Sequence, residues 1–252
     1  MTPPRRLRRE PDGAVAAVDV GSVLRAEGPH ISVGILTADL AALREEFALL
    51  ERVGARLVHT DVMDGVFCPM FTVGPPFVAA QRTPLIKDVH LMIQDPLERV
   101  AAFVEAGADM ITFQVESAPN PLRVLQVLGD AANANDPSHG IVRGLAVSPG
   151  TPLEVLEPLL DDLEYVLILA INPGWGGQRF RPGTAGRLER VRAMIAANGR
   201  PALVGIDGGI TKANISQIAQ MRPDVVVAGS SIFDGTPAVE ENARYMLSMV
   251  RP

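Results

Sequence analysis

The sequence predicts a single (β/α)8 TIM barrel with an N-terminal extension. Eight short apolar segments alternate with longer amphipathic segments between residues 31 and 249. The short segments are apolar almost throughout, which is typical of a parallel sheet whose outer face is covered by helices. Eight such repeats within about 220 residues fit a closed barrel better than an open sheet. We therefore expect residues 1–29 to form the extension and residues 30–252 to form one catalytic barrel domain.

The extension begins with a basic cluster that acidic residues follow. Organelle transit peptides are Arg-rich but poor in acidic residues, whereas Glu10, Asp12 and Asp19 follow this cluster. We therefore expect residues 1–29 to be either a disordered, solvated tail or a strand-and-helix extension packed outside the barrel. The basic cluster comprises Arg5, Arg6, Arg8 and Arg9.

The first expected strand is 31–36, and Thr37 is a plausible N-cap for a helix that runs to Val53. Leu40, Leu43 and Phe47 recur at helical spacing and give this helix one apolar stripe. The remaining strands are expected at 56–61, 86–92, 110–115, 141–147, 165–171, 202–207 and 225–228. Helices are expected to include 97–105, 187–196 and 239–249, and the polar segment 131–140 is expected to be a loop.

Composition restricts the possible partners. Hydrophobic residues make up 47% of the 252 residues, which is enough for a large core. The net charge of −6 gives no general reason to expect nucleic acid or an anionic membrane as a partner. No apolar run approaches the ~20 residues that cross a bilayer. The single cysteine, Cys68, excludes an intramolecular disulfide, so we expect a cytoplasmic protein. We expect its partner to be a small molecule.

Polar side chains lie at the ends of three expected strands. His59 and Asp61 project from the same face of the second strand, because side chains alternate along a strand. His90 lies near the end of the third strand and Asp207 ends the seventh. Strand ends converge on the mouth of a barrel, so the four could form a site for a divalent metal such as Zn²⁺, Fe²⁺ or Mn²⁺. Taken singly, each is more often a hydrogen-bonded structural group, so the prediction depends on the combination.

Three glycine-containing loops follow the last three expected strands and indicate a phosphate site. Glycine lets backbone N–H groups approach an anion closely, and barrels often bind phosphate after strands seven and eight. The same glycines would also allow tight turns without any ligand, so only the three loops together favour phosphate. Trp175 lies inside the first loop and indicates a mobile lid, and Gly229 would open a short helix. The residues are Gly174, Trp175, Gly176, Gly177, then Gly208 and Gly209, then Gly229 and Ser230.

These residues lie in motifs that resemble the ribulose-phosphate 3-epimerase family. The resemblance covers about residues 31–249, and the tail before Pro29 lies outside it. It implies a barrel of the ribulose-phosphate-binding type. The motifs are His59-Thr-Asp61-Val-Met63-Asp64-Gly65, Asp88-Val-His90-Leu-Met92, Asn172-Pro-Gly-Trp-Gly-Gly-Gln178, Ile206-Asp207-Gly-Gly209 and Gly229-Ser-Ser-Ile232.

The resemblance implies the interconversion of D-ribulose 5-phosphate and D-xylulose 5-phosphate in the pentose phosphate pathway. It also implies one divalent cation per subunit (Zn²⁺, Fe²⁺, Mn²⁺ or Co²⁺) on His59, Asp61, His90 and Asp207, and a homo-oligomer. Asp61 and Asp207 would double as acid and base. This agrees with the chemistry, because the C3 proton lies α to a carbonyl and epimerisation needs one proton donor or acceptor on each face of an enediolate.

Three further residues are expected around the intermediate. Met63 and Met92 alternate with the expected ligands, so they would form an apolar floor under it, although ordinary barrel core is an equally good interpretation. Leu169 stands where the family often has a methionine that faces the substrate.

Several positions depart from the family pattern. Gly34 replaces the serine of the family's Pro-Ser-Ile-Leu motif, which is a substrate contact, and Gln114 replaces a common histidine. Val66, Cys68 and Met70 replace the common His, Val and Asn. We interpret Cys68 as a packed loop residue, because this mechanism needs no thiol nucleophile.

Two alternatives to the pentulose-phosphate epimerase stay open. Gly34 makes room beside the sugar, so the substrate could be another ketose phosphate, such as a hexulose 6-phosphate. The other alternative is a barrel that binds a sugar phosphate without turning it over. The complete set of four expected ligands argues against that second alternative.

Overall fold

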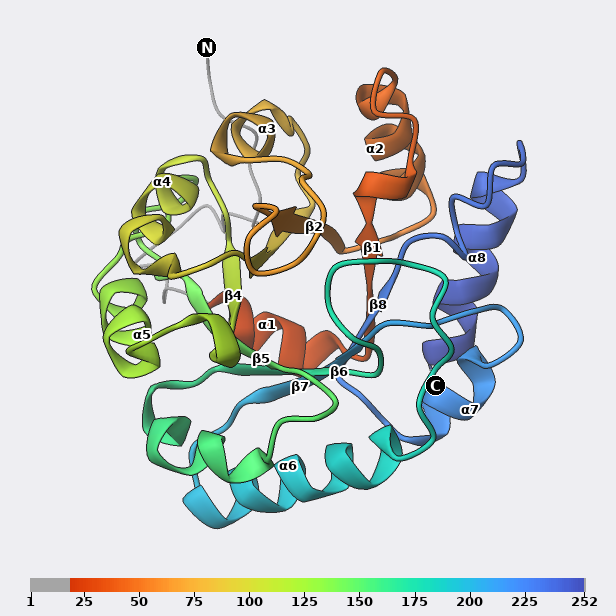
Figure 1. The fold of residues 1–252 in the computed structure, drawn as a ribbon. Helices are drawn as coiled ribbons and strands as arrows, with labels where there is room; N and C mark the ends of the chain where they lie inside the picture. Colours follow the sequence, from red (N-terminus) through yellow and green to blue (C-terminus); the bar gives the residue numbers. More distant parts are fainter. Residues whose placement is uncertain (1–18, 252) are drawn as a thin grey trace, which may run out of the picture.

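The computed structural model describes residues 19–251, and the basic cluster of the expected extension lies outside this range. Eight parallel strands form a closed barrel in sequence order, because β1 pairs with both β2 and β8 (Figure 1). The strands are β1 (His30–Gly34), β2 (Leu57–Met63), β3 (Ile86–Met92), β4 (Met110–Gln114), β5 (Val142–Val147), β6 (Tyr165–Leu169), β7 (Leu203–Asp207) and β8 (Val225–Ala228). The sequence therefore predicted the TIM barrel correctly.

Helices surround the barrel and cover the outer face of its sheet (Figure 1). They are α2 (Leu43–Arg52), α3 (Pro75–Ala80), α4 (Val100–Glu105), α5 (Pro121–Gly129), α6 (Thr184–Asn198), α7 (Ile215–Gln220) and α8 (Val239–Val250). Between β5 and β6 the chain instead forms a ten-residue 3-10 helix, Leu153–Asp162, which contains Pro158. Among the described residues, no helix is both long and apolar enough to cross a membrane.

The expected helix from Thr37 to Val53 is wrong at its start. Thr37 ends a short 3-10 helix, and α2 begins only at Leu43. Asp39 explains the delay, because its Oδ1 accepts the Ala41 N–H at 2.9 Å and so favours a turn over a helix. The expected helix at 97–105 is likewise a 3-10 turn followed by α4.

The short helix expected at Gly229 is also wrong. Residues after β8 form one turn, in which the Gly229 carbonyl accepts from the N–H groups of Ile232 and Phe233 at 2.8 and 3.0 Å. The chain does not continue as a helix from there, and α8 begins only at Val239.

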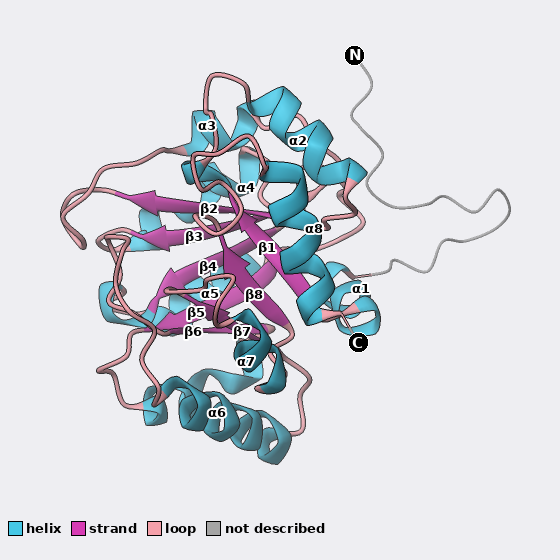
Figure 2. Ribbon diagram, turned by 90° about the vertical axis from the view of Figure 1, so that its right-hand side faces the viewer, coloured by secondary structure: helices cyan, strands magenta, loops and turns pink. Residues whose placement is uncertain are grey.

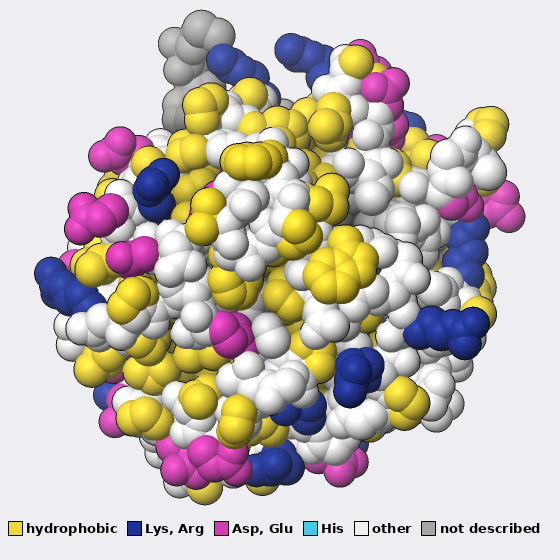
Figure 3. All heavy atoms as spheres, viewed as in Figure 1, with side chains coloured by type: hydrophobic (Ala, Val, Ile, Leu, Met, Phe, Trp, Pro, Cys, Tyr) yellow, Lys and Arg dark blue, Asp and Glu magenta, His cyan; other side chains and the backbone are white. Residues whose placement is uncertain are grey.

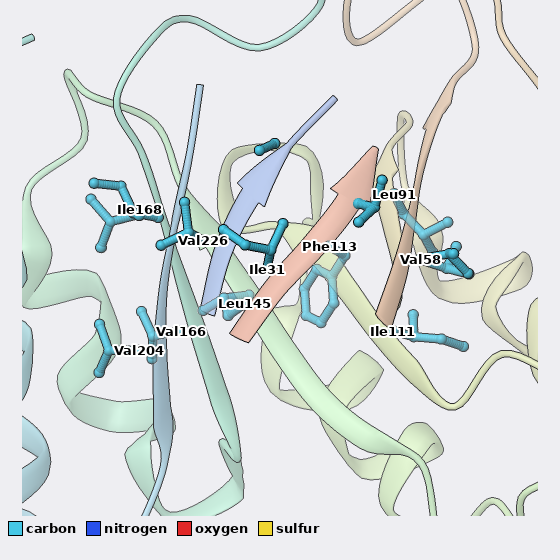
Figure 4. Packing of buried hydrophobic residues seen from close by; sticks show 14 of the residues in the cluster. Ile31, Val58, Leu91, Ile111, Phe113, Leu145, Val166, Ile168, Val204 and Val226 are labelled. Carbon is cyan, nitrogen blue, oxygen red and sulfur yellow. The ribbon is translucent and has the colours of Figure 1, made fainter. Parts of the chain in front are cut away.

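Two apolar clusters lie on the two faces of the sheet. The outer cluster packs between strands and helices, and Figure 4 shows members from every strand, including Ile31, Val58, Leu91 and Val226. The inner cluster fills the barrel. On β2, Leu57 belongs to the inner cluster and Val58 to the outer one. His59 and Asp61 share the inward direction of Leu57, because side chains alternate along a strand.

Helix α1 (Val20–Glu27) lies at the end of the barrel where the strands begin, opposite the arrowheads in Figure 2. Its Val20 and Leu24 pack into the inner cluster, and Leu24 is fully buried. Asp19 caps the helix by accepting the Ser22 N–H at 3.0 Å. The part of the expected extension that the structure describes thus closes one end of the barrel and leaves the other end for a site.

Candidate active site and metal centre

Two histidines and two aspartates converge at the open end of the barrel. Each of four side chains offers one potential ligand atom, and these four atoms all lie within 4.8 Å of one another. Strand register explains this convergence, since Asp61 of β2 lies directly beside His90 of β3. The four residues are His59, Asp61, His90 and Asp207.

Asp61 lies between the two imidazoles. Its Oδ1 is 3.2 Å from His59 Nε2 and 3.0 Å from His90 Nδ1. Both histidines are completely buried, whereas the Asp61 side chain is 27% exposed, so the centre opens towards the mouth. Two nitrogen and two carboxylate donors that meet at one point fit a divalent transition metal.

The two carboxyl groups have opposite pKa shifts. Burial raises the pKa of Asp61, but the charges and hydrogen bonds of His59 and His90 together outweigh it and bring the pKa well below its usual range. Burial, and after it the charge of the nearby Asp61, raise the pKa of Asp207 to about 6. The site therefore places an ionised carboxylate beside a carboxyl group that holds its proton more strongly.

The pKa of the His59 imidazole is raised in the same site. Burial alone would lower its pKa, but the charges of Asp88 and Asp61 raise it well above 6.5. A metal would therefore have to displace a proton from His59.

A cavity of about 580 Å³ adjoins the two carboxylates. Residues of β1, β2 and all three glycine loops contribute to its lining. On this face of the molecule, charged side chains lie mainly around the rim (Figure 3). Of the residues expected from sequence, those that line the cavity are Gly34, Asp61, Gly176, Gly177, Asp207, Gly208, Gly209, Gly229 and Ser230.

The other expected contacts lie outside the lining of this cavity. Gly174 packs against the β2–α3 loop, where an added Cβ would come within 2.5 Å of the Cys68 Cβ. Trp175 is 47% exposed. Met92 and Leu169 are buried, whereas Met63, which pairs with Met92, lines a separate cavity of about 340 Å³ beside α4.

The departures from the family pattern have distinct surroundings. Gly34 forms part of the cavity wall, and Gln114 is fully buried with its Nε2 3.2 Å from His90 Nε2. Val66 and Met70 are exposed. Cys68 is 4% exposed, and burial raises the pKa of its thiol, so it has the environment of a packed residue.

Sequence reasoning missed several lining residues. Thr37, Arg179 and Asn214 all line the cavity. The Asn214 side chain donates to the Gly209 carbonyl at 2.8 Å and so fixes the loop after β7. Arg179 directly follows the first glycine loop, which is the signal that could have identified it.

A (β/α)8 barrel with a candidate metal centre and glycine loops at one mouth defines a class of barrel enzymes. The model of the Ribulose-phosphate 3 epimerase family matches residues 30–233, and the chain belongs to this family of isomerases. The chain is 39% identical over 229 residues to ribulose-phosphate 3-epimerase 2 of Cupriavidus necator, covering 88% of this chain and 91% of that protein. It is 36% identical over 206 residues to the Bacillus subtilis ribulose-phosphate 3-epimerase, covering 81% and 91%.

Solved structures show the same fold at low identity. A tryptophan synthase chain of Mycobacterium tuberculosis superposes with a TM-score of 0.64 at 19% identity, covering 95% of this chain and 100% of that chain. This likeness shows a shared barrel architecture, and the family assignment comes from the sequence relatives.

Proposed function

We propose that the protein interconverts D-ribulose 5-phosphate and D-xylulose 5-phosphate by moving the C3 proton through Asp61 and Asp207. The observation that supports this most directly is the placement of both carboxyl groups on the wall of one cavity together with three glycine loops. Family membership implies a sugar-phosphate substrate of this kind.

The two carboxyl groups suit a two-base reaction. One ionised carboxylate removes the C3 proton from one face of the sugar, and the other carboxyl group returns a proton to the opposite face. Asp61 lies on β2 and Asp207 on β7. These strands are not neighbours in the barrel, so the two carboxyl groups reach the cavity from different sides. Their opposite pKa shifts show that the two carboxyl groups have different surroundings.

The remaining residues hold the substrate and the cation. His59, Asp61, His90 and Asp207 would bind a divalent cation, which supplies Lewis-acid stabilisation of negative charge on the oxygens at C2 and C3. The loops at Gly208 and Gly229 present backbone groups to the phosphate. Trp175, in the loop after β6, covers the mouth when the substrate is bound. Met92 and Leu169, which are buried, would form apolar surroundings of the intermediate, whereas Met63 lines a separate cavity.

Proton NMR of D-ribulose 5-phosphate in D2O with metal-loaded protein tests the proposal. We expect deuterium at C3 together with the appearance of D-xylulose 5-phosphate. Absence of both, with bound metal verified, would reject this substrate. Gly34 then favours the second candidate, a 3-epimerase of a larger ketose phosphate, because no side chain fills the wall at that position. No exchange with any ketose phosphate would favour a barrel that only binds its ligand.

The cellular context and assembly belong to the same proposal. We infer that the protein acts in the cytoplasm as a homo-oligomer, and its single cysteine suits a reducing compartment. Light scattering of the purified protein measures the subunit number.

A further inference from the structure

Both candidate histidine ligands have a buried partner on the ring nitrogen that faces away from Asp61. His59 points Nε2 at Asp61 and Nδ1 at Asp88. His90 is turned the other way, with Nδ1 at Asp61 and Nε2 at Gln114. The two rings therefore meet the centre through different nitrogens, and each outer nitrogen contacts a different kind of side chain.

Asp88 is a fixed acceptor for His59. It is fully buried, and its Oδ2 is 2.8 Å from His59 Nδ1. The same oxygen accepts the Ser32 hydroxyl at 2.8 Å, and Ser32 is also fully buried. A carboxylate held in this way keeps a proton on Nδ1 and leaves Nε2 free to bind a cation.

Gln114 contacts His90 through an amide that has a second, unused polar atom. Its Nε2 lies 3.2 Å from His90 Nε2, while its Oε1 has no hydrogen-bond partner among the residues that the structure describes. If the His90 proton lies on Nδ1, that nitrogen donates to Asp61 and Nε2 accepts from the Gln114 amide. Rotation of the amide by half a turn would present Oε1 to the same nitrogen.

We propose that Asp88 and Gln114 are positioning residues that hold His59 and His90 in opposite tautomers, so that His59 binds the metal through Nε2 and His90 through Nδ1. This inference rests on the metal centre of the proposed function. When His90 Nδ1 binds a cation, its proton must lie on Nε2, and the Gln114 amide turns so that Oε1 accepts it. With Oε1 turned to His90, Gln114 favours the tautomer that leaves Nδ1 for the cation, as Asp88 favours the tautomer that leaves His59 Nε2 for it.

The test measures metal affinity and imidazole tautomers. Co²⁺ affinity is determined by competition with a chelator, and ¹⁵N NMR of labelled histidines is recorded on the Zn²⁺-loaded protein. We expect Gln114→Leu to weaken Co²⁺ binding by about 10–100-fold, and Asp88→Asn to weaken it in the same direction. Gln114→Glu keeps an acceptor and should bind Co²⁺ about as tightly as wild type.

Two variants control for changes of packing. Thr112→Val alters a buried hydroxyl on the same inner face of β4, two residues before Gln114, that makes no hydrogen bond to either ring. Ser32→Ala removes the second hydrogen bond to Asp88 and leaves His59 in place. Thr112→Val should leave Co²⁺ affinity unchanged, and Ser32→Ala should weaken it less than Asp88→Asn does.

The NMR measurement on wild type tests the two tautomers even where a variant fails to fold. We expect His59 to carry its proton on Nδ1 and His90 on Nε2 in the Zn²⁺-loaded protein. The reverse tautomers, or a folded Gln114→Leu protein with wild-type Co²⁺ affinity, would overturn the positioning roles alone. Wild-type protein that binds neither Co²⁺ nor Zn²⁺ would overturn the metal centre itself, together with this inference.

Discussion

Gly34 at the end of β1 lies directly against Gly229, the first residue after β8. A Cβ added at Gly34 would come 3.1 Å from the Gly229 Cα and 3.4 Å from its backbone nitrogen. Both residues line the cavity, so the wall that lacks a side chain also adjoins one of the loops expected to bind phosphate. A side chain at position 34 therefore affects the sugar and the phosphate loop together.

Replacing Gly34 by Ser and by Ala separates these two effects. Both variants add a Cβ that displaces Gly229 by a few tenths of an ångström, but only Ser adds a hydroxyl group. We expect the Ser variant to have a KM for D-ribulose 5-phosphate about fivefold lower than that of the Ala variant, the effect of one hydrogen bond. Equal KM values would show that a hydroxyl at this position does not contact the substrate.

Asp207→Asn removes one of the two proposed acid–base groups from the candidate active site. We expect turnover to fall by about 10²–10⁴-fold at saturating metal, because general acid–base catalysis by one group has this size. Thermal unfolding should show an intact fold, and inorganic phosphate should still bind. Near-wild-type deuterium exchange at C3 in this variant would contradict the role of Asp207.

Metal binding should strengthen as pH rises. In the metal-free protein the pKa of Asp207 is about 6, and that of His59 is well above 6.5. Both groups must lose their protons to act as ligands, so protons compete with the metal most strongly at low pH. At pH 7 we expect about one proton or more to be released per bound ion. Calorimetry in buffers with different ionisation enthalpies measures this release, and a binding heat independent of the buffer would contradict it.

Arg179 is a cationic side chain on the cavity wall, and it is exposed. We expect Arg179→Met to raise KM for a phosphorylated substrate about two- to fivefold, since an exposed charge interaction is worth up to ~1 kcal/mol. The effect should shrink at high salt because of screening. Arg123→Met on α5, an exposed arginine outside this cavity, is the matched control and should leave KM unchanged.

Leu24 of α1 should contribute to stability without contributing to the site. It is fully buried in the inner cluster at the closed end of the barrel. We expect Leu24→Ala to lower the free energy of unfolding by about 2–5 kcal/mol and to leave metal affinity unchanged. Urea denaturation measures this loss, and the half-buried Val23→Ala on the same helix should cost less. A loss no larger than that of Val23→Ala would show that α1 does not stabilise the barrel.

The order of the strands followed from the sequence, but some boundaries did not. Runs such as 225–228 are apolar and short, and they match β8 as observed. The stripe of Leu40, Leu43 and Phe47 indicated a helix that began too early. The Asp39 side chain accepts the Ala41 N–H and stabilises a turn there instead of a helix. Hydrophobic periodicity carries no information about such a local hydrogen bond.

The candidate metal ligands were predictable because each is a distinctive residue type at the end of a strand. Alternation along β2 is enough to put His59 and Asp61 on one face. The outer partners were not identified, since an aspartate two residues before His90 or a glutamine in β4 has no characteristic pattern of its own. Only the register of β2, β3 and β4 brings Asp88 and Gln114 to the two imidazoles.

The sequence by itself determined the barrel, the family and the four side chains that converge at its mouth, because hydrophobic periodicity and residue type are local properties. The tertiary structure decided which nitrogen of His59 and His90 faces Asp61, and it gave Asp61 and Asp207 opposite pKa shifts. Those properties arise from burial and from charges on neighbouring strands far apart in the sequence. The ring orientations and the pKa shifts therefore exist only in the folded barrel.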